Sequence, residues 1–470
     1  MLLSDHDDKP KEACGVFGIY NHPEAAKITY LGLYALQHRG QESAGISSAN
    51  GSAMMTYKQM GLVADVFNEA ILEKLTGHLA MGHVRYSTTG DSVLRNAQPI
   101  HVEYGRGSLA VAHNGNLVNA SVIKDELEAY GSIFQSSCDS EVVVHLIVRS
   151  GKISFVDTVV DALKKVRGAY SLLVMNEKEL LAVRDPYGFR PLCLGKLGEA
   201  YVVASESCAF DIIDATYIRD IEPGEVILIN KQGLRSIKPF GENRPSPCVF
   251  EFIYFARPDS MIYDNAVHAI RKQMGQVLAR EHPVEADIVV PVPDSSNTAA
   301  LGYAQESKIP FELALIRSHY VGRTFIEPNQ AIRDFGAKIK YNPVRSVLKN
   351  KRVVVVDDSL VRGTTQRKIT KMIRESGAKE IHLRISAPPI MYPCFYGMDF
   401  PTRKELIAAT HTTEEIAKYL RVDSVGYLSI EGMMTAAASA SSHFCKACFD
   451  GNYPVKFAGQ PLQEELRSKC

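Results

Sequence analysis

The segment "RVVVVDDSLVRGTT" constrains the fold of this chain more than any other. Its four consecutive valines predict a strand that is buried on both faces. The strand leads into Asp357 and Asp358, then a polar loop with Gly363, then "TQRKITKMIRESG", which has helical periodicity and ends at Gly377. A buried strand, a loop and a helix in this order predict a parallel α/β sheet.

The sequence before this segment follows the same alternation. A helical pattern in "DNAVHAIRKQMGQVLARE" precedes the apolar run "ADIVVPVPDSS", which also ends in a polar loop. Strands that alternate with helices predict a doubly wound sheet, and such sheets bind ligands at the carboxyl ends of their strands. We therefore predict an α/β domain with a binding site at residues 357–365.

The first half of the chain has a different pattern. From Cys14 to Lys238, short β-branched runs such as "AYSLLVMN" are separated by Gly, Asn and Asp turns. Two stretches, "SEVVVHLIVRSG" and "FVDTVVDALKKVRG", have the spacing of helices with one apolar face. The pattern predicts sheets covered by helices. The proline-rich segment "KPFGENRPSP" marks a boundary, so we predict domains at 14–238 and 239–470.

Composition limits the classes of partner. Lysine and arginine number 53, as do aspartate and glutamate, so no overall field attracts nucleic acid or a membrane surface. No apolar run approaches the roughly 18 to 20 residues of a membrane span, and the start "MLLSDHDDKP" is acidic and polar, unlike a secretory signal. Nine cysteines, an odd number in a long chain, argue against a disulfide framework. We expect a cytoplasmic protein with small-molecule ligands.

The loop after the valine strand has the composition of a ribose-phosphate site. Two adjacent carboxylates can accept hydrogen bonds from vicinal ribose hydroxyls, and a Gly- and Thr-rich turn offers N–H and hydroxyl groups to a phosphate. The alternative is that Thr364 or Thr365 only caps the helix while the aspartates are solvated. The loop resembles the signature of phosphoribosyltransferases that use phosphoribosyl pyrophosphate. The predicted binding residues are Asp357, Asp358, Ser359, Arg362, Gly363, Thr364 and Thr365.

A pyrophosphate ligand is strongly negative and needs cations to bind it. Mg²⁺ prefers oxygen ligands shared between protein and phosphate, so we predict a magnesium site at Ser295, Asp357 and Asp358. The stretch 317–345 is rich in basic side chains, which form either a solvated loop or a lid that closes over a polyanion. These side chains are Arg317, His319, Arg323, Arg333, Lys338, Lys340 and Arg345.

Five polar clusters mark the first half: "ACGVFGI", "LQHRGQESAGI", "GHVRYSTTG", "AHNGNLVN" and "SSCDSEVV". Two arginines and an aspartate can hold a small zwitterion by its carboxylate and its ammonium group, and an amide side chain with a glycine N–H can form an oxyanion hole. Taken singly, Asn-Gly is a turn signal, a lone arginine is a surface residue, and a cysteine in an apolar strand is a buried thiol. The residues concerned are Cys14, Arg39, Arg85, Asn114, Gly115 and Asp139.

In this order the five clusters resemble those of class II glutamine amidotransferases. The resemblance implies an α+β glutaminase domain of the amino-terminal-nucleophile type, in which Cys14 becomes the mature amino terminus and attacks glutamine. Its α-amine, with a pKa near 7.7 to 8.0, then serves as the base. Residues 1–13 would be a propeptide, and Ala13 departs from the acidic residue that usually precedes the cysteine in this family. The implied glutamine-binding residues are Arg39, Arg85 and Asp139, and the implied oxyanion hole is Asn114 with Gly115.

The two halves together resemble the glutamine phosphoribosylpyrophosphate amidotransferase family. This resemblance implies that ammonia from glutamine passes internally to phosphoribosyl pyrophosphate and gives 5-phosphoribosylamine, glutamate and pyrophosphate, the first step of de novo purine synthesis. It also implies a homo-oligomer, commonly a tetramer, inhibited by purine nucleotides. The alternatives are another class II amidotransferase and a non-catalytic regulator that binds phosphoribosyl pyrophosphate. The "VVVVDDSLVRGTT" loop argues against the first, and the glutaminase clusters against the second.

Four other cysteines are candidate ligands of a metal site. By themselves Cys445 and Cys448, a Cys-x-x-Cys pair, predict a zinc or redox pair. One branch of the resembled family carries a [4Fe-4S] cluster on four cysteines, and all four positions are filled here, by Cys248, Cys394, Cys445 and Cys448. The resemblance therefore implies a structural cluster. We expect Cys138, Cys193, Cys208 and Cys470 to be structural or incidental thiols.

Overall fold

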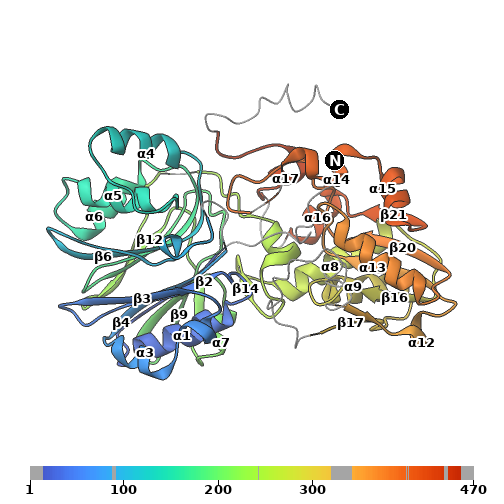
Figure 1. Ribbon diagram of the computed structural model, residues 1–470, viewed down its shortest axis with the longest axis horizontal. Coiled ribbons are helices and arrows are strands. Elements are labelled where there is room, and N and C mark those ends of the chain that lie inside the picture. The colour runs from blue at the N-terminus through green and yellow to red at the C-terminus, as the bar shows by residue number, and fades with distance from the viewer. Residues whose placement is uncertain are drawn as a thin grey trace.

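The computed structural model describes residues 14–86, 91–241, 243–318, 341–398, 400, 402–438 and 443–456. The first and second halves of the chain form two bodies that lie side by side (Figure 1). Within these residues no helix combines the length and the apolar character needed to cross a membrane. The predicted domain bounds stay a prediction.

Two antiparallel sheets form the first half. The first has seven strands in the order β11-β9-β10-β1-β4-β2-β3, and the second has six in the order β13-β12-β8-β7-β6-β5. The strands of the first sheet are β1 Gly15–Tyr20, β2 Ser43–Ala49, β3 Met54–Met60, β4 Leu79–Arg85, β9 Cys193–Leu197, β10 Ala200–Ala204 and β11 Thr216–Asp220. Those of the second are β5 Ile100–Tyr104, β6 Gly107–Leu117, β7 Gly168–Met175, β8 Leu180–Arg184, β12 Val226–Asn230 and β13 Gly233–Ile237.

Helices cover the outer face of each sheet (Figure 1). Between the sheets, Val16 and Met81 of the first share one buried cluster with Ala112 and Leu173 of the second. The layers are therefore helix, sheet, sheet and helix, which confirms the predicted covered sheets. The helices beside the first sheet are α1 Ala25–Ala35, α2 Val63–Val66, α3 Glu69–Lys74 and α7 Cys208–Asp211; α4 Ala120–Ala129, α5 Glu141–Arg149 and α6 Phe155–Leu163 lie beside the second, and η1 Leu94–Asn96 is a short 3-10 turn.

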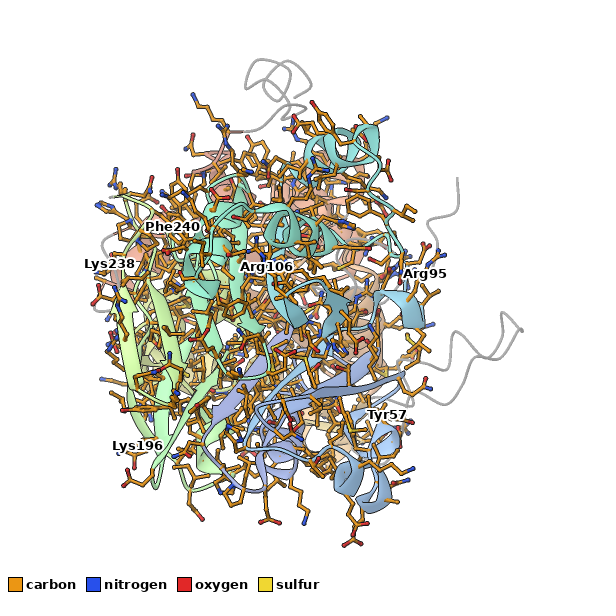
Figure 2. The ribbon with its side chains drawn as sticks, turned by 90° about the vertical axis from the view of Figure 1, so that its left-hand side faces the viewer. Tyr57, Arg95, Arg106, Lys196, Lys238 and Phe240 are labelled. Atoms are coloured by element: carbon orange, nitrogen blue, oxygen red, sulfur yellow. The ribbon has the colours of Figure 1, made fainter. Side chains whose placement is uncertain are left out.

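The chain leaves the second sheet after β13. Figure 2 looks onto the first half, with Arg95 and Lys238 at its outline and Phe240 close to Lys238. Phe240 packs against the core under the helices α4 to α6. Packing with the first half thus continues two residues past Lys238.

A parallel sheet forms the centre of the second half, as predicted. Its order is β16-β19-β20-β21, and both neighbours of β19 run parallel to it. The strands are β16 Ile288–Pro291, β19 Arg352–Asp357, β20 Glu380–Ile385 and β21 Ser424–Tyr427. The helices are α8 Val267–Glu281, α9 Asn297–Ser307, α12 Arg345–Leu348, α13 Thr364–Glu375, α14 Ile407–Thr410, α15 Thr413–Leu420, α16 Ile430–Ala436 and α17 Ala447–Asp450.

The second half also contains elements that the sequence patterns do not predict. A π-helical turn follows the proline-rich segment, and two short antiparallel strand pairs lie outside the parallel sheet. These elements are η2 Glu251–Phe255, the pair β14 Met261–Ile262 and β15 Asn265–Ala266, the pair β17 Leu315–Arg317 and β18 Tyr341–Pro343, and the 3-10 turn η3 Arg403–Glu405.

The register of the parallel sheet positions the predicted loop. Val353 to Val356 are fully buried and pair with β16 on one side and β20 on the other. Val356 lies opposite Pro291, so β19 and β16 end at the same edge of the sheet. This register brings Asp357 and Asp358 close to the residues that follow β16.

Candidate active sites

Cys14 directly precedes β1 and is held at both its thiol and its backbone. The residue is 8% exposed, and its Sγ donates a hydrogen bond to the Tyr86 carbonyl at 3.4 Å. Its own carbonyl accepts a bond from Arg39 Nε at 3.2 Å. Burial raises the pKa of the Cys14 thiol, while the Tyr86 bond and the charge of Arg85 act in the opposite direction. The thiol is therefore protonated at neutral pH and requires a base for nucleophilic attack.

Asn114 and Gly115 lie inside β6, so the turn interpretation of Asn-Gly is wrong. Asn114 is fully buried, and among the described residues neither its Oδ1 nor its Nδ2 has a hydrogen-bond partner. Gly115 has φ +148°, and a Cβ added there would lie 2.0 Å from the Ala169 carbonyl oxygen. Leaving a buried amide unpaired costs about 1 to 3 kcal/mol, so its retention favours a role in binding a ligand.

A buried histidine joins the nucleophile strand to β6. His83 of β4 pairs with Val16 of β1, and its Nε2 lies 3.0 Å from the His113 carbonyl oxygen. Burial lowers the pKa of His83 to about 3, so the ring is neutral and Nε2–H is the donor. This bond links β4, the neighbour of β1 in the first sheet, to the residue before Asn114 in β6. The sequence reasoning missed His83, although the residue stands in the cluster "GHVRYSTTG".

Arg85 and Asp139 provide opposite charges around the thiol. Both are buried; Arg85 lowers the pKa of Cys14 and Asp139 raises it. Arg85 Nη1 donates to the Asp91 carbonyl at 3.1 Å, and Asp139 Oδ2 accepts from the Leu117 N–H at 2.8 Å. Their positions fit the predicted zwitterion site, and glutamine binding by these two residues stays a prediction.

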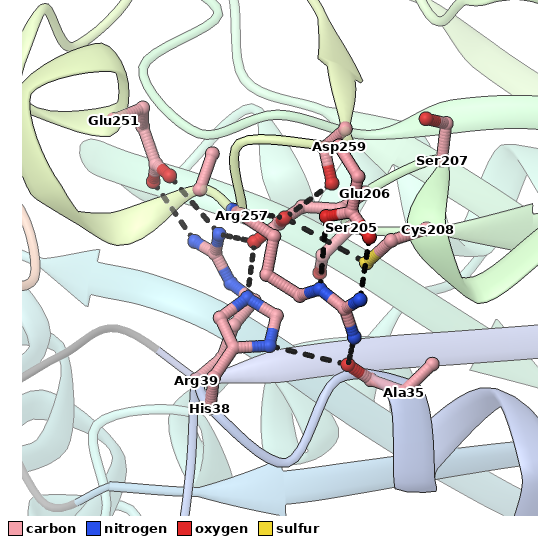
Figure 3. Close-up of polar contacts among 12 residues, drawn as sticks. Ala35, His38, Arg39, Ser205, Glu206, Ser207, Cys208, Glu251, Arg257 and Asp259 are labelled. Atoms are coloured by element: carbon pink, nitrogen blue, oxygen red, sulfur yellow. Dashed lines mark hydrogen bonds and ion pairs between the residues drawn. The ribbon is translucent and has the colours of Figure 1, made fainter. Parts of the chain in front are cut away.

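Arg39 has a different environment from the one predicted (Figure 3). Its guanidinium is 1% exposed and donates from Nη1 to Glu206 at 2.5 Å. The same group donates to the two carboxylate oxygens of Glu251 at 2.9 and 3.0 Å. Since two carboxylates and the Cys14 carbonyl occupy this guanidinium, the geometry favours support of Cys14 over contact with the glutamine carboxylate. The sequence patterns did not identify Glu206 and Glu251 as partners of Arg39.

The two aspartates of the phosphoribosyl loop are buried at 6% and 2% exposure, so the solvated alternative is wrong. Ser296 Oγ donates to Asp357 at 3.0 Å. Ser295 Oγ and Ser359 Oγ donate to the two oxygens of Asp358 at 2.5 and 2.6 Å. The structure thus brings the three predicted magnesium ligands Ser295, Asp357 and Asp358 together at the ends of β16 and β19. Ser296 was not predicted.

The rest of the loop forms the start of α13. Gly363, with φ +78°, is the N-cap residue, and no side chain of the described structure caps the helix there, so the capping alternative is wrong. The first N–H groups of a helix lack intrahelical partners and suit a phosphate, and Thr364 and Thr365 occupy this turn. Arg362 Nε and Nη2 both lie 3.2 Å from the Glu405 carboxylate.

Little of the basic stretch 317–345 can be placed. Arg317 donates to Asp294 at 2.9 Å, and Arg345 opens α12. The other five, His319, Arg323, Arg333, Lys338 and Lys340, lie outside the described residues, so the lid stays a prediction.

The four cysteines predicted to bind a cluster converge from three segments. The backbones of Cys248 and Cys445 form an isolated parallel β-bridge, and the Val249 N–H donates to the Cys445 carbonyl at 3.3 Å. Burial raises the pKa of Cys448, and the neighbouring Cys394, Cys248 and Cys445 raise it further. The Cys-x-x-Cys pair is therefore not isolated. Within the described ranges no group of three or more metal-ligating side chains is already arranged for a metal ion, and the eight described cysteines form no disulfide.

Three of the remaining thiols belong to the described residues. Cys138, Cys193 and Cys208 are buried, and Cys470 lies outside the described residues.

Comparisons with known proteins agree with a division into two domains. Residues 83–211 match the glutamine amidotransferase domain family, and residues 259–388 match the phosphoribosyl transferase domain family. Amidophosphoribosyltransferase 1, chloroplastic, of Arabidopsis thaliana is 52% identical over 96% of this chain and 80% of its own length. The amidophosphoribosyltransferase of Bacillus subtilis (strain 168) is 50% identical over 95% of this chain and 94% of its own length.

Solved structures agree along nearly the whole chain. The B. subtilis glutamine phosphoribosylpyrophosphate amidotransferase complexed with ADP and GMP has a TM-score of 0.91 at 50% identity, and covers 96% of this chain and 99% of its own. A structure described as the allosteric regulatory enzyme of purine biosynthesis has the same TM-score and identity. From this similarity over both domains, the chain belongs to the amidophosphoribosyltransferase family.

Proposed function

We propose that this chain carries out the family reaction at two places, glutamine hydrolysis at Cys14 and phosphoribosyl transfer at the loop 357–365. Glutamine-dependent amidotransfer to phosphoribosyl pyrophosphate, in purine biosynthesis, is the activity of the family. The single observation that carries the residue assignment is the fully buried Asn114 amide, whose two polar atoms have no partner among the described residues.

Glutamine hydrolysis begins with the Cys14 thiol. Because burial raises its pKa, a base must accept the thiol proton, and the α-amine of Cys14 can do so once residues 1–13 are removed. Sulfur attacks the side-chain carbonyl carbon of glutamine, and Asn114 Nδ2 and the Gly115 N–H stabilise the oxyanion. The C–N bond breaks as the proton passes to the leaving nitrogen, which departs as ammonia. Water then hydrolyses the thioester to glutamate.

Two charged side chains beside the thiol orient the glutamine substrate. Arg85 binds the α-carboxylate of glutamine and Asp139 its ammonium group. Arg39 supports the Cys14 backbone.

Removal of residues 1–13 is testable by intact mass under denaturing conditions. The expected mass is that of a chain beginning at Cys14. A chain that retains Met1 would have no α-amine on Cys14, and only ammonia-dependent transfer would then be expected.

At the second site, Asp357 and Asp358 accept hydrogen bonds from the ribose hydroxyls in place of the serine hydroxyls that they bind here. The start of α13 binds the 5-phosphate. Ammonia attacks C1 of the ribose, the C1–O bond breaks and pyrophosphate leaves. Internal transfer of ammonia avoids its protonation and loss to water.

The oxygens of Asp357, Asp358 and Ser295 fit Mg²⁺, whose hard-ligand preference they match. When bound, the ion neutralises the pyrophosphate leaving group. We expect transfer to require Mg²⁺ and to stop on addition of a chelator.

The four cysteine thiols fit a [4Fe-4S] cluster as a donor set. Three of them are buried, and the Tyr396 N–H donates to Cys394 Sγ at 3.3 Å, a contact typical of ligating sulfur. When bound, the cluster joins the segment after residue 247 to the carboxyl-terminal segment, a structural role. Anaerobic purification should give about four irons per chain by iron analysis, and Cys445→Ser should lower both the iron content and the melting temperature.

Assembly, regulation and location are further parts of the proposal. Because the B. subtilis structure holds ADP and GMP, we propose feedback inhibition by purine nucleotides. We also propose a homotetramer in the cytoplasm. Native mass and inhibition by added ADP and GMP test the assembly and the regulation, and cell fractionation tests the location.

The proposed function as a whole is tested by pyrophosphate release. Release with glutamine, phosphoribosyl pyrophosphate and Mg²⁺, together with equimolar glutamate, is the expected result. Ligand binding without pyrophosphate release under either nitrogen source would instead identify a non-catalytic regulator.

A further inference from the structure

Glu251 joins the two halves of the molecule in a fully buried ion cluster. It lies in η2, in the second half of the chain, and its side chain is fully buried. Arg39 donates two bonds to it, and Arg190 Nη1 donates a third at 3.0 Å (Figure 3 shows Arg39 and Glu251). Both arginines come from the first half. One carboxylate of the second half therefore fixes two guanidinium groups of the first.

Arg39 connects Glu251 to Cys14, the proposed nucleophile. Two nitrogens of the guanidinium bind Glu251, and its third nitrogen, Nε, donates to the Cys14 carbonyl at 3.2 Å. A guanidinium is planar and rigid, so fixing one edge of it on a carboxylate orients the remaining N–H. Together with Glu206, which also binds Nη1, Glu251 therefore orients the N–H that holds the backbone of Cys14.

Arg190 connects Glu251 to the segment that packs against β6, the strand of the proposed oxyanion hole. Arg190 Nε and Nη2 donate to the Tyr396 carbonyl at 3.1 and 2.9 Å. The next residue, Gly397, is so close to β6 that an added Cβ would lie 3.0 Å from the Gly115 carbonyl carbon. Asn116 Nδ2 donates to the Phe395 carbonyl at 3.0 Å. The segment 395–397 of the second half therefore lies against the strand that carries Asn114 and Gly115.

We propose that Glu251 is a positioning residue for glutamine hydrolysis, which completes the glutaminase site from the second half of the chain. Through Arg39 it sets the position of Cys14, and through Arg190 it holds the segment 395–397 against Gly115. The two contacts start from one carboxylate, so a single substitution disturbs both the nucleophile and the oxyanion hole. The inference rests on the proposed role of Cys14.

Glu251→Gln in the full chain is the test. The variant keeps the size and one oxygen acceptor, and Glu206 still neutralises Arg39. Since misplacement of a reacting group by 1 Å can cost about 10²-fold, we expect the kcat of glutamine hydrolysis to fall at least about tenfold. The KM for glutamine should stay within about threefold, and ammonia-dependent transfer within about twofold, because Glu251 contacts neither substrate.

Two further variants test whether a loss of activity in Glu251→Gln is due to misfolding or to an unspecific effect of a substitution in this region. Arg39→Lys keeps a positive charge between both glutamates but lacks the N–H that reaches the Cys14 carbonyl, so it should give the same kinetic split. Asp259→Asn is the matched control, because its exposed ion pair with Arg257 lies in the same region and does not contact Arg39. It should leave all rates unchanged.

Hydrogen–deuterium exchange measures positioning independently of turnover. We expect exchange of the peptide that begins at Cys14 to be about tenfold faster in Glu251→Gln than in the unmodified protein, with no change in Asp259→Asn. Unchanged exchange and unchanged kcat would overturn the inference, and so would an equal loss of both the glutamine- and the ammonia-dependent activities. If the unmodified protein hydrolyses no glutamine, the proposed function fails, and the exchange comparison still decides the positioning role.

Discussion

The two candidate sites are built in opposite ways. The glutaminase site gathers Cys14, Arg85, Asn114 and Asp139 from four separate segments and buries an amide, that of Asn114, without a partner among the described residues. Most of the phosphoribosyl site is one contiguous loop, and serine hydroxyls already satisfy its two aspartates. The unpaired amide of the first site suits a negative charge that develops during the reaction. The aspartates of the second site suit a ligand whose hydroxyls replace those of the serines.

The two sites should differ in their kinetic response to substitution. Substitutions of Cys14 and Asn114 in the first site should lower the kcat of glutamine hydrolysis, because these two groups act on the transition state. Substitutions in the second site should weaken use of phosphoribosyl pyrophosphate, because its groups bind the substrate before reaction.

The largest effect is expected from Cys14→Ala. Glutamine-dependent turnover should fall by at least about 10⁴-fold because the nucleophile is removed, while ammonia-dependent transfer continues within about twofold. Parallel assays of pyrophosphate release with glutamine and with ammonium chloride measure both. Cys193→Ala, at a buried thiol of the same half, is the control. Loss of both activities in a folded Cys14→Ala protein would break the division between the two sites.

Asn114→Ala is expected to have the second largest effect. Loss of one oxyanion donor should lower the kcat of glutamine hydrolysis by about 10²- to 10³-fold with little change in KM. Because the amide has no partner among the described residues, its removal should not lower the melting temperature. Glutamate release and thermal denaturation measure the two outcomes. A rise in KM alone would show that Asn114 binds glutamine and is no oxyanion donor.

Asp358→Asn tests the second site with a smaller effect. The variant should raise the KM for phosphoribosyl pyrophosphate about tenfold, the equivalent of about 1.4 kcal/mol, and should spare basal glutamine hydrolysis. Initial rates over a range of phosphoribosyl pyrophosphate measure it. Asp423→Asn is the control, since Asp423 pairs with Arg374 and precedes β21, at the amino end of the sheet. Unchanged kinetics for Asp358→Asn would remove the aspartates from the binding site.

The smallest effect concerns a structural carboxylate beside the first site. Burial raises the pKa of Glu141, but contact with His145 and the bonds from Gln135 and Ser136 lower it to about 2. A folded-state pKa below the unfolded value stabilises the fold above pH 4.5, and this stabilisation is lost as the pH falls towards 2.

Glu141→Gln should therefore lower the free energy of unfolding by about 2 kcal/mol at pH 7. The difference from the unmodified protein should shrink steadily below pH 4.5. Denaturant titrations at pH 7, 5, 4 and 3 measure it, with the exposed Glu126→Gln as the control. A difference that is constant with pH would assign Glu141 a packing role only.

Sequence patterns predicted the strand, loop and helix of the second site because each of them is local. The valine strand, the paired aspartates and the start of α13 are consecutive, and each depends on periodicity or loop composition that a short window contains. The predicted role of Arg39 did not fit, and Glu206, Glu251 and His83 were missed. Their partners are far apart along the chain: Arg39 and Glu251 are separated by 212 positions.

By itself the sequence determined the parallel sheet, the covered sheets, the loop at residues 357–365 and the candidate residues of both sites. Only the tertiary structure decided that Asn114 lies within a strand, because pairing of Asn114 with Ser171 of β7 overrides the turn preference of Asn-Gly. Only it decided which carboxylates Arg39 meets. Local preferences arise between neighbours in the chain, whereas a buried charge must be paired with whatever group packing brings to it, and packing joins segments that no short window contains.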